Sequence, residues 1–332
     1  MKICLTCQKG DWTVAHTGKG KFASRLIRVW EGLGVKVTQD PKERVDIDLQ
    51  ITRYMYTPKY ARKSIIRRGP VKYDTNMDYK HHNKLERGNL KQCDAIVYQS
   101  LFSKNANHKL VYNPKGRVPE TVIYNGADSA DYVGVKPYQS EFKYNFLAST
   151  REWVLEKRLV DIIKSFKEAD IHDSKLWIAG QIWDKPNRFP DFQKDFKKRF
   201  GCVNIQFLGP TDDRKLARLY RMATCLLHAV YIDAQPNAIA EALAAGCKVL
   251  CTNVGGQREV IGKVNPDWIV QDKPWDFKPC NRRKLPRLNR CEYAAAMLDM
   301  CNDATEIDAS CIDINNIASQ YLNFFEKVLS DA

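Results

Sequence analysis

Two carboxylates flank the start of an expected helix, Asp233 before it and Glu241 inside it, with seven residues between them. Pro236 opens this helix and Gly246 closes it, because proline fits a first helical turn and glycine fits the position just past an end. Carboxylates accept paired hydrogen bonds from sugar hydroxyls, and the unpaired amides of a first helical turn favour a phosphate. The pattern therefore favours a ligand that carries both groups, as a nucleotide-sugar does.

At these residues the chain resembles the family 4 retaining glycosyltransferases of GT-B fold. Their signature is an acidic residue, seven intervening residues and a glutamate, followed by a small-residue helix and a Gly-Gly turn. Here the acids are Asp233 and Glu241, and the following segments read EALAAGCKVL and TNVGGQREVI. The first acid of the family is usually glutamate, so Asp233 departs from the pattern and shortens the reach to the sugar. The resemblance is strongest over residues 144–262 and continues over 1–130.

This resemblance implies transfer of a hexosyl or pentosyl unit from a nucleoside diphosphate sugar, with a UDP-sugar expected, to a hydroxyl group. The anomeric configuration would be retained, and the reaction would need neither a cofactor nor a metal. Glu241 would hold the ribose diol and Asp233 the ring hydroxyls of the sugar. In the family an arginine and a lysine neutralise the departing diphosphate, whose charge grows in the transition state. Here they are Arg151 and Lys157, with Arg158 as a stand-in for Arg151; the plainer alternative is solvated charges at a helix start.

Further donor contacts are implied at three loops. The run Thr17-Gly18-Lys19-Gly20-Lys21 reads by itself as a strand-to-helix turn; family members place a glycine-rich loop here, so Gly18 and Gly20 are expected to close on the phosphates. Gly180 stands where the family contacts the nucleobase, although a strand-ending turn explains it equally well. Asn237 borders the helix start, where a donor contact and a capping role share one geometry.

A candidate for proton transfer lies in the first half of the chain. Related sequences carry an aspartate or a histidine near the position of Asp74, beside the reacting centre, so Asp74 could orient the acceptor hydroxyl or take its proton. Asp78, His81 and His82 are the alternatives, and a surface or turn position is the plainer interpretation of each. We assign no protein nucleophile.

The remaining polar groups in apolar runs are interpreted mainly as core. Cys4 and Cys7 face opposite sides of a strand, and no second pair completes a zinc site. His228 lies inside an apolar strand, where it could touch the transferred sugar or be a buried histidine. The eleven cysteines are scattered, which suits reduced thiols in the cytoplasm. No stretch approaches the ~20 apolar residues of a membrane span, and no signal peptide is visible.

Positive charge is concentrated in the first half of the chain. Residues 1–139 carry 25 Lys and Arg against 13 Asp and Glu, whereas residues 140–332 carry 28 against 26. The segment Arg53–Arg68 mixes cations with tyrosines and isoleucines. This composition suits phosphate contacts with base stacking, an anionic membrane surface that the chain would join peripherally, or an ordinary basic face. The imbalance favours an acidic partner.

Two acceptors stay open, and beside them a different class of protein. A hydroxylated base in nucleic acid, as in phage-type DNA modification, is narrowly favoured. The alternative is a lipid-linked or cell-envelope glycan at an anionic membrane surface. The third is a catalytically silent nucleic-acid-binding scaffold, against which the set of Asp233, Glu241 and Lys157 speaks.

The elements that must position these residues predict an α/β architecture. A length of 332 residues suits two domains. Strands alternating with helices indicate parallel sheets built from βαβ units, and therefore two Rossmann-like domains of the GT-B fold facing across a cleft. We expect an acceptor domain at 1–135, a donor domain at 140–312 and a helix at 313–332, which in this family often returns to the first domain. Expected strands of the first half are 1–7, 35–39, 47–52, 71–74, 95–100 and 121–126.

Overall fold

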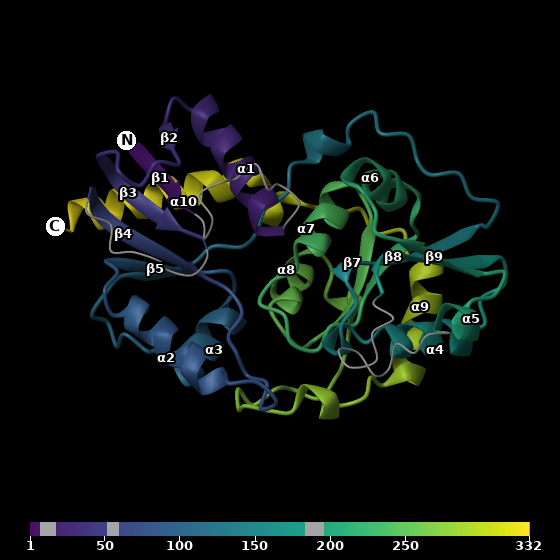
Figure 1. Ribbon diagram of the computed structural model, residues 1–332. Helices are drawn as coiled ribbons and strands as arrows, with labels where there is room; N and C mark the ends of the chain where they lie inside the picture. The colour runs from purple at the N-terminus through teal and green to yellow at the C-terminus, as the bar shows by residue number, and fades with distance from the viewer. Residues whose placement is uncertain (7–17, 52–59, 183–195, 332) are drawn as a thin grey trace. The chain divides into compact units, whose positions relative to one another are not determined.

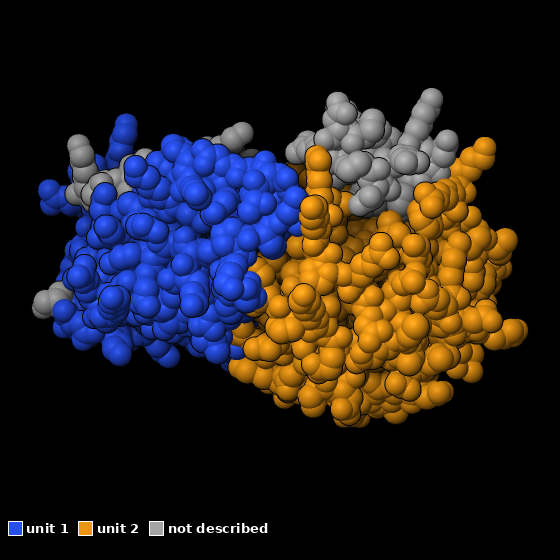
Figure 2. Space-filling model, turned by 90° about the horizontal axis from the view of Figure 1, so that it is seen from below, with its two compact units in different colours: residues 1–128, 276–281, 312–332 blue, residues 129–275, 282–311 orange. Residues whose placement is uncertain are grey.

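The computed structural model describes residues 1–6, 18–51, 60–182 and 196–331 of the chain. Its contacts divide the chain into two compact units, coloured separately in Figure 2. Unit 1 comprises Met1–Asp128, Asp276–Asn281 and Ile312–Ala332, and unit 2 comprises Ser129–Trp275 and Arg282–Cys311. Each unit contains a six-stranded parallel sheet with helices on both faces, so the predicted pair of Rossmann-like sheets is confirmed.

The sheet of unit 1 has the strand order β2-β1-β3-β4-β5-β6, and every pair of neighbours is parallel. The strands are β1 (Lys2–Thr6), β2 (Lys36–Thr38), β3 (Val45–Gln50), β4 (Ala61–Arg68), β5 (Ala95–Tyr98) and β6 (Glu120–Val122). The helices are α1 (Gly18–Gly32), α2 (Tyr79–Leu90), α3 (Leu101–Leu110) and α10 (Ile314–Ser330). Helices α1 and α10 cover one face of the sheet, and α2 and α3 cover the other (Figure 1).

The last long helix, α10, belongs to the core of unit 1. Apolar residues recur along it at helical spacing and form one buried stripe, from Ile314 to Phe325. Trp30 of α1 donates a hydrogen bond from Nε1 to the backbone oxygen of Ala318 at 3.1 Å. Its ring also packs edge-on against Tyr321, with 6.0 Å between ring centroids. The cover on this face of the sheet is therefore complete only when α10 packs beside α1.

Two expectations for unit 1 were wrong, a strand at residues 71–74 and a surface position for the last two arginines of the basic stretch. Residues 71–74 form no strand, and β4 instead runs through Ala61–Arg68, in the middle of the sheet between β3 and β5. Arg67 and Arg68 are only 2% and 7% exposed, so they are not the surface cations that the composition suggested. Residues 52–59 of the basic stretch lie outside the described part of the chain.

Burial of these two guanidinium groups is possible because each finds partners on its own face of the sheet. Arg67 donates from Nε to the Tyr321 hydroxyl at 2.8 Å, and its guanidinium lies 4.2 Å from the centroid of the Phe22 ring. Arg68 points to the opposite face and forms an ion pair with Glu86 at 2.8 Å. A strand can therefore carry adjacent cations into a core when the helices on both faces supply acceptors.

A short segment late in the chain also joins unit 1. The backbone of Cys280 accepts a hydrogen bond from Thr75 N at 3.1 Å and donates one to Tyr73 O at 3.0 Å. The Phe277 ring packs on Phe102 of α3, with centroids 5.3 Å apart. The residues on either side of Asp276–Asn281 belong to unit 2.

The sheet of unit 2 has the order β9-β8-β7-β10-β11-β12, again parallel throughout. The strands are β7 (Tyr144–Glu152), β8 (Ser174–Gln181), β9 (Ile205–Gly209), β10 (Cys225–His228), β11 (Lys248–Thr252) and β12 (Ile269–Val270). The helices are α4 (Leu159–Ala169), α5 (Phe196–Phe200), α6 (Asp213–Met222), α7 (Asn237–Ala244), α8 (Gln257–Val264) and α9 (Arg290–Asn302). Short 3₁₀ turns are η1 (Ser129–Tyr132), η2 (Leu155–Lys157), η3 (Pro266–Trp268), η4 (Arg282–Lys284) and η5 (Ser310–Ile312).

This strand order is that of dinucleotide-binding sheets, with β7 as the first strand and β10 as the fourth. Connections leave β7 and β10 in opposite directions, so the loops that follow them diverge. Helix α4 packs with α9 on one face, where Phe166 meets Phe146 of β7. Helix α6 lies on the other, where the Tyr220 hydroxyl is 3.2 Å from Ser149 Oγ. The switch point between β7 and β10 is the expected ligand position of this unit.

No helix in the described part of the chain is long and apolar enough to cross a membrane.

Candidate functional site

The loop after β7 places Lys157 at the switch point of unit 2. Trp153 anchors the loop, because its Nε1 donates to Ala179 O at 3.1 Å and its backbone N donates to Gln181 O at 2.9 Å. The turn η2 then ends at Lys157, and Arg158, with φ +52°, redirects the chain into α4. Glu156 is held as well, by an ion pair with Arg282 of η4. The Lys157 side chain therefore extends from a fixed backbone.

Arg158 is committed to the fold of unit 2. Its guanidinium forms an ion pair with Asp272, donates to Pro286 O at 2.6 Å and lies 4.7 Å from the centroid of the Tyr231 ring. These contacts fasten the segment that follows β12 to the start of α4. The expectation that Arg158 could replace Arg151 at a diphosphate therefore has no support in the structure. Arg151 itself is exposed near the end of β7.

The loop after β10 carries Asp233, and the Gly-Gly turn of the sequence signature holds it. Gly256 N donates to Asp233 O at 2.9 Å. Gly255 has φ +104°, and a Cβ atom there would lie 2.8 Å from the same oxygen. The buried amide of Gln257 donates to Val230 O at 2.9 Å, at the start of the loop. Glycine is thus required at position 255, where the backbone turns toward α8 beneath Asp233.

Lys157 and Asp233 meet. Lys157 Nζ is 2.8 Å from Asp233 Oδ2, and the two side chains are 20% and 21% exposed. Burial by itself would raise the pKa of Asp233, but the charge and hydrogen bond of Lys157, with the backbone N–H of Gln235, hold that pKa below its ordinary value. A carboxylate and an ammonium are therefore both present, one from each loop of the switch point.

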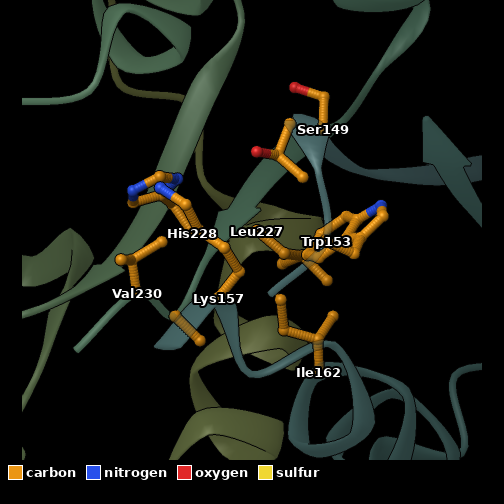
Figure 3. A pocket seen from close by; sticks show the side chains of 9 residues that line it. Ser149, Trp153, Lys157, Ile162, Leu227, His228 and Val230 are labelled. Carbon is orange, nitrogen blue, oxygen red and sulfur yellow. The ribbon is translucent and has the colours of Figure 1, made fainter. Parts of the chain in front are cut away.

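His228, at the end of β10, lies beside this pair. It is 4% exposed, and its Nε2 has no hydrogen-bond partner among the described residues. Burial, followed by the Lys157 charge, lowers the pKa of His228 to about 3, so its ring is neutral near pH 7. Figure 3 shows His228 and Lys157 lining a small pocket together with Ser149, Trp153 and Ile162. The sequence left a sugar contact and a plain core position open for His228, and it lies at the wall of the site.

Helix α7 begins next to Asp233. Pro236 occupies the cap position, and no side chain caps the helix by a hydrogen bond. Asn237 is the first helical residue and not the cap. Glu241 follows four residues later, on the same face of α7, and is buried. The arrangement leaves the first-turn amides without a side-chain cap, directly after the loop that carries Asp233.

Gly180 has a clear packing role. It lies in β8 with φ +121°, and a Cβ atom there would be 2.0 Å from Thr150 O of β7. The two strands therefore approach each other in a way that only glycine permits. This packing role alone accounts for glycine at position 180, and it is compatible with a nucleobase contact at the same place.

The candidates of unit 1 occupy a different part of the chain. Gly18 and Gly20 start α1, while Thr17 and Cys7 lie outside the described residues. Asp74 Oδ1 accepts hydrogen bonds from the backbone and side-chain nitrogens of Asn76, at 3.0 and 2.8 Å. Asp78 caps α2 by accepting from His81 N at 3.0 Å. Asp78 thus has a structural role, and Asp74 stabilises a turn.

The structure therefore brings together Lys157, Asp233 and His228 at one switch point, with α7 and its Glu241 adjoining in the same unit. Arg151 and Gly180 belong to neighbouring strands of that unit. Sequence reasoning missed the supports at Gly255, Gln257 and Asp272. The Gly-Gly turn was the visible signal for the first, whereas nothing local in the sequence marks the contact of Arg158 with Asp272.

Comparison with known proteins agrees with this geometry. Residues 136–276 match the family described as Glycosyl transferases group 1. The chain is similar to the lipopolysaccharide glucosyltransferase WaaG of Escherichia coli K12, with 29% identity over 115 residues, which span 35% of this chain and 29% of that protein.

Solved structures show the same fold. A sucrose-phosphate synthase from Thermosynechococcus elongatus superposes with a TM-score of 0.66 at 13% identity, covering 100% of both chains. The Anabaena protein Alr3699/HepE, solved with UDP and glucose, superposes with a TM-score of 0.61 at 13% identity, covering 98% of this chain and 100% of its own. The fold is GT-B, and together the comparisons support a glycosyltransferase.

Proposed function

We propose that this chain transfers a glycosyl unit from a UDP-sugar to an acceptor hydroxyl, with retention of anomeric configuration and without a metal ion. The observation that carries the proposal is the meeting of Lys157 and Asp233 at the switch point of unit 2, next to the uncapped start of α7. A cation and helical amides suit a diphosphate. A carboxylate beside them suits sugar hydroxyls.

Each proposed role follows from the chemistry of the group. Lys157, with Arg151, neutralises the diphosphate as negative charge develops on the leaving group. Asp233 accepts hydrogen bonds from ring hydroxyls of the transferred sugar, and Glu241 accepts them from the ribose diol. Asn237 borders the diphosphate. Gly180 lies near the nucleobase.

The Lys157–Asp233 ion pair makes donor binding an exchange of partners. Without donor, each charge neutralises the other at 2.8 Å. With donor, the ammonium gains phosphate oxygens and the carboxylate gains hydroxyl donors. One nucleotide-sugar therefore supplies partners for both charged groups. A free phosphate would pair only with the ammonium, and a free sugar only with the carboxylate.

For the acceptor we propose an anionic glycan, such as a phosphorylated or lipid-linked envelope saccharide. The burial of Arg67 and Arg68 removes two of the cations that favoured nucleic acid. The similarity to a lipopolysaccharide glucosyltransferase supports the envelope alternative. Gly18 and Gly20 remain proposed donor contacts and Asp74 a proposed acceptor contact of unit 1. A hydroxylated DNA base is the competing acceptor, motivated by the positive charge of residues 1–139.

The direct test is UDP release from a panel of UDP-sugars, with phosphorylated envelope saccharides, hydroxymethylated DNA and plain DNA as acceptors. We expect one sugar to be consumed, with an α-linked product from an α-linked donor, and activity to persist after chelation of divalent metals. Failure of UDP and of every UDP-sugar to bind in calorimetry would contradict the proposed donor. Transfer to hydroxymethylated DNA alone would contradict the glycan acceptor and keep the enzyme class.

A further inference from the structure

We propose that unit 1 contains its own phosphate-binding site, formed by the exposed side chains of Lys19 and Lys72 at the carboxyl end of β4. The ligand class is a phosphate group, as a monoester or as part of a diphosphate. Whether this phosphate belongs to the donor or to the acceptor is a question that rests on the proposed function. The binding of phosphate itself does not depend on that function.

Contacts between α1 and β4 bring Lys19 to the end of β4. Arg67, near the end of that strand, stacks on the Phe22 ring of α1 at 4.2 Å. Lys19 precedes Phe22 by three residues, so it lies one helical turn away on the same side of α1. Arg67 is in turn fixed by Tyr321 and Asn125. The base of Lys19 is therefore tied to a buried strand.

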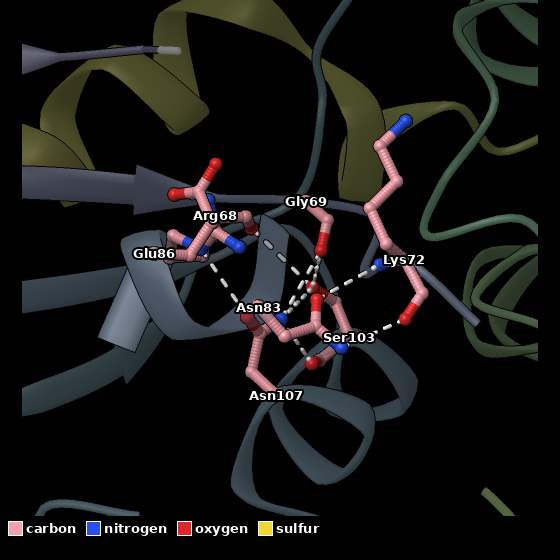
Figure 4. A network of polar contacts seen from close by, with 7 residues as sticks. All are labelled: Arg68, Gly69, Lys72, Asn83, Glu86, Ser103 and Asn107. Atoms are coloured by element: carbon pink, nitrogen blue, oxygen red, sulfur yellow. Dashed lines mark hydrogen bonds and ion pairs between the residues drawn. The ribbon is translucent and has the colours of Figure 1, made fainter. Parts of the chain in front are cut away.

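The loop that carries Lys72 is held by buried polar side chains, as Figure 4 shows. Ser103 Oγ and Asn107 Nδ2 of α3 both donate to Gly69 O, at 2.9 and 3.1 Å. The Asn83 amide of α2 accepts from Lys72 N at 3.3 Å and donates to Lys72 O at 2.8 Å. Gly69 permits this packing, because a Cβ atom there would lie 2.8 Å from the Gln99 amide.

The side chain of Lys72 takes no part in this network. Figure 4 shows it extending away from Asn83, with its ammonium at the far end. Within the described part of the chain, no hydrogen bond or ion pair involves the ammonium of Lys72 or of Lys19. Three buried amide and hydroxyl side chains thus fix the backbone of an exposed cation.

The charge balance at this place is strongly positive. Lys19 lies within electrostatic range of Arg67, Arg68 and Lys72, and the carboxylate there, Glu86, is already paired with Arg68. The side chain of Lys19 is exposed at the surface but partly desolvated by its surroundings, and this partial burial, followed by the charges of Arg67 and Arg68, lowers its pKa. Repulsion of this kind is relieved when a multiply charged anion binds between the cations. Two lysines are suitable point-charge donors for phosphate oxygens.

The first experiment measures phosphate binding without turnover. Inorganic phosphate and pyrophosphate are titrated into the whole protein and into Lys19→Ala and Lys72→Ala, with Lys84→Ala, an exposed lysine of α2, as matched control. We expect each test variant to weaken pyrophosphate binding to unit 1 roughly tenfold, and the control to leave it unchanged. Because pyrophosphate can also bind near Lys157, all proteins carry Lys157→Met in this titration. Equal affinity in all of them would overturn the site.

The second experiment identifies the source of the phosphate, in proteins with native Lys157. If UDP affinity falls about tenfold in Lys19→Ala and Lys72→Ala, the site binds the diphosphate of the donor. The other outcome is unchanged UDP affinity with a higher KM for a phosphorylated acceptor and an unchanged KM for its dephosphorylated form. In that case the site binds the phosphate of the acceptor. Either result supports the site. Binding of UDP by the wild-type protein is the separate test of the proposed function. If the wild-type protein does not bind UDP, the result of the first experiment still stands. Unchanged thermal midpoints confirm that the variants fold, and unaltered values for UDP and for every acceptor would overturn the inference.

Discussion

Lys157 Nζ lies 2.8 Å from Asp233 Oδ2, although 75 residues separate them in the chain and the two lie in loops that follow different strands of the sheet. One follows β7 and the other follows β10, the two strands from which the connections diverge. The contact therefore joins the two loops that any ligand at this switch point must meet. A ligand that separates the pair has to replace both interactions.

The first prediction concerns the cation of this pair. Lys157→Met keeps the apolar stem of the side chain and removes its charge, so turnover should fall by about 10²–10³-fold, because negative charge develops on the leaving group in the transition state. Lys164→Met, an exposed lysine of α4, should change turnover less than about twofold. Steady-state kinetics with a saturating UDP-sugar measures both. Equal, small losses would mean that this loop does not face the diphosphate.

Donor affinity should depend on Glu241. Glu241→Ala removes a buried acceptor from α7 and should weaken UDP binding by ~1.5–3 kcal/mol, the range for a hydrogen bond to a charged group. Asp299→Ala removes an exposed carboxylate from α9 of the same unit and should leave affinity unchanged. Calorimetry with UDP gives both values. A folded Glu241→Ala protein with wild-type affinity for UDP would sink the assignment to the ribose.

The neutral His228 should make stability depend on pH. Burial and the Lys157 charge lower its pKa from 6.5 to about 3. Between these values the unfolded chain binds a proton that the folded chain does not, so this contribution to stability is complete above pH 6.5 and is lost as pH falls. The slope can reach about 1.4 kcal/mol per pH unit.

His228→Asn should remove that slope, and the exposed His172→Asn should keep it. Urea unfolding between about pH 4.5 and 7 measures the effect in a range where Asp233, whose pKa is held below 3.8, contributes little. An identical dependence in wild type and His228→Asn would show that the histidine accepts a proton in the folded state.

The Gly-Gly turn should tolerate no side chain at its first position. Gly255→Ala must adopt φ +104° and brings a Cβ atom to 2.8 Å from Asp233 O. We expect a loss of about 1–3 kcal/mol in the free energy of unfolding. Because the proposed role of Asp233 is to hold sugar hydroxyls, the affinity for the UDP-sugar should fall more than the affinity for UDP. Gly262→Ala in α8, where the nearest atom would be 3.7 Å away, is the control. Equal stability of the two variants in urea would contradict this account of the turn.

The arrangement of the candidate site in unit 2 was accessible to sequence reasoning because its signals are local. Pro236, Gly246 and the Gly-Gly turn each mark a backbone requirement within a few residues of the side chains that they position. The same locality made the position of Lys157 between a strand and a helix predictable, whereas its role toward a donor stays a prediction.

The basic half was misjudged for the opposite reason. Nothing near Arg67 in the sequence indicates that Tyr321 will accept its hydrogen bond, and Arg68 is matched by Glu86 from a helix that follows the strand. Composition counts charges without their partners, so two buried cations were taken for surface ones. Lys19 and Lys72, which the composition did not distinguish from them, are exposed cations near the end of β4.

The position of α10 in the core of unit 1 has a consequence for synthesis. The strands of unit 1 leave the ribosome first, but the helix that covers α1 and its sheet face emerges after the whole sheet of unit 2. Unit 2 can thus complete its fold while the first sheet still exposes Phe22, Trp30 and their neighbours to the translation machinery and to chaperones. Burial of this face of the first sheet therefore has to wait until the last helix of unit 1 has been translated.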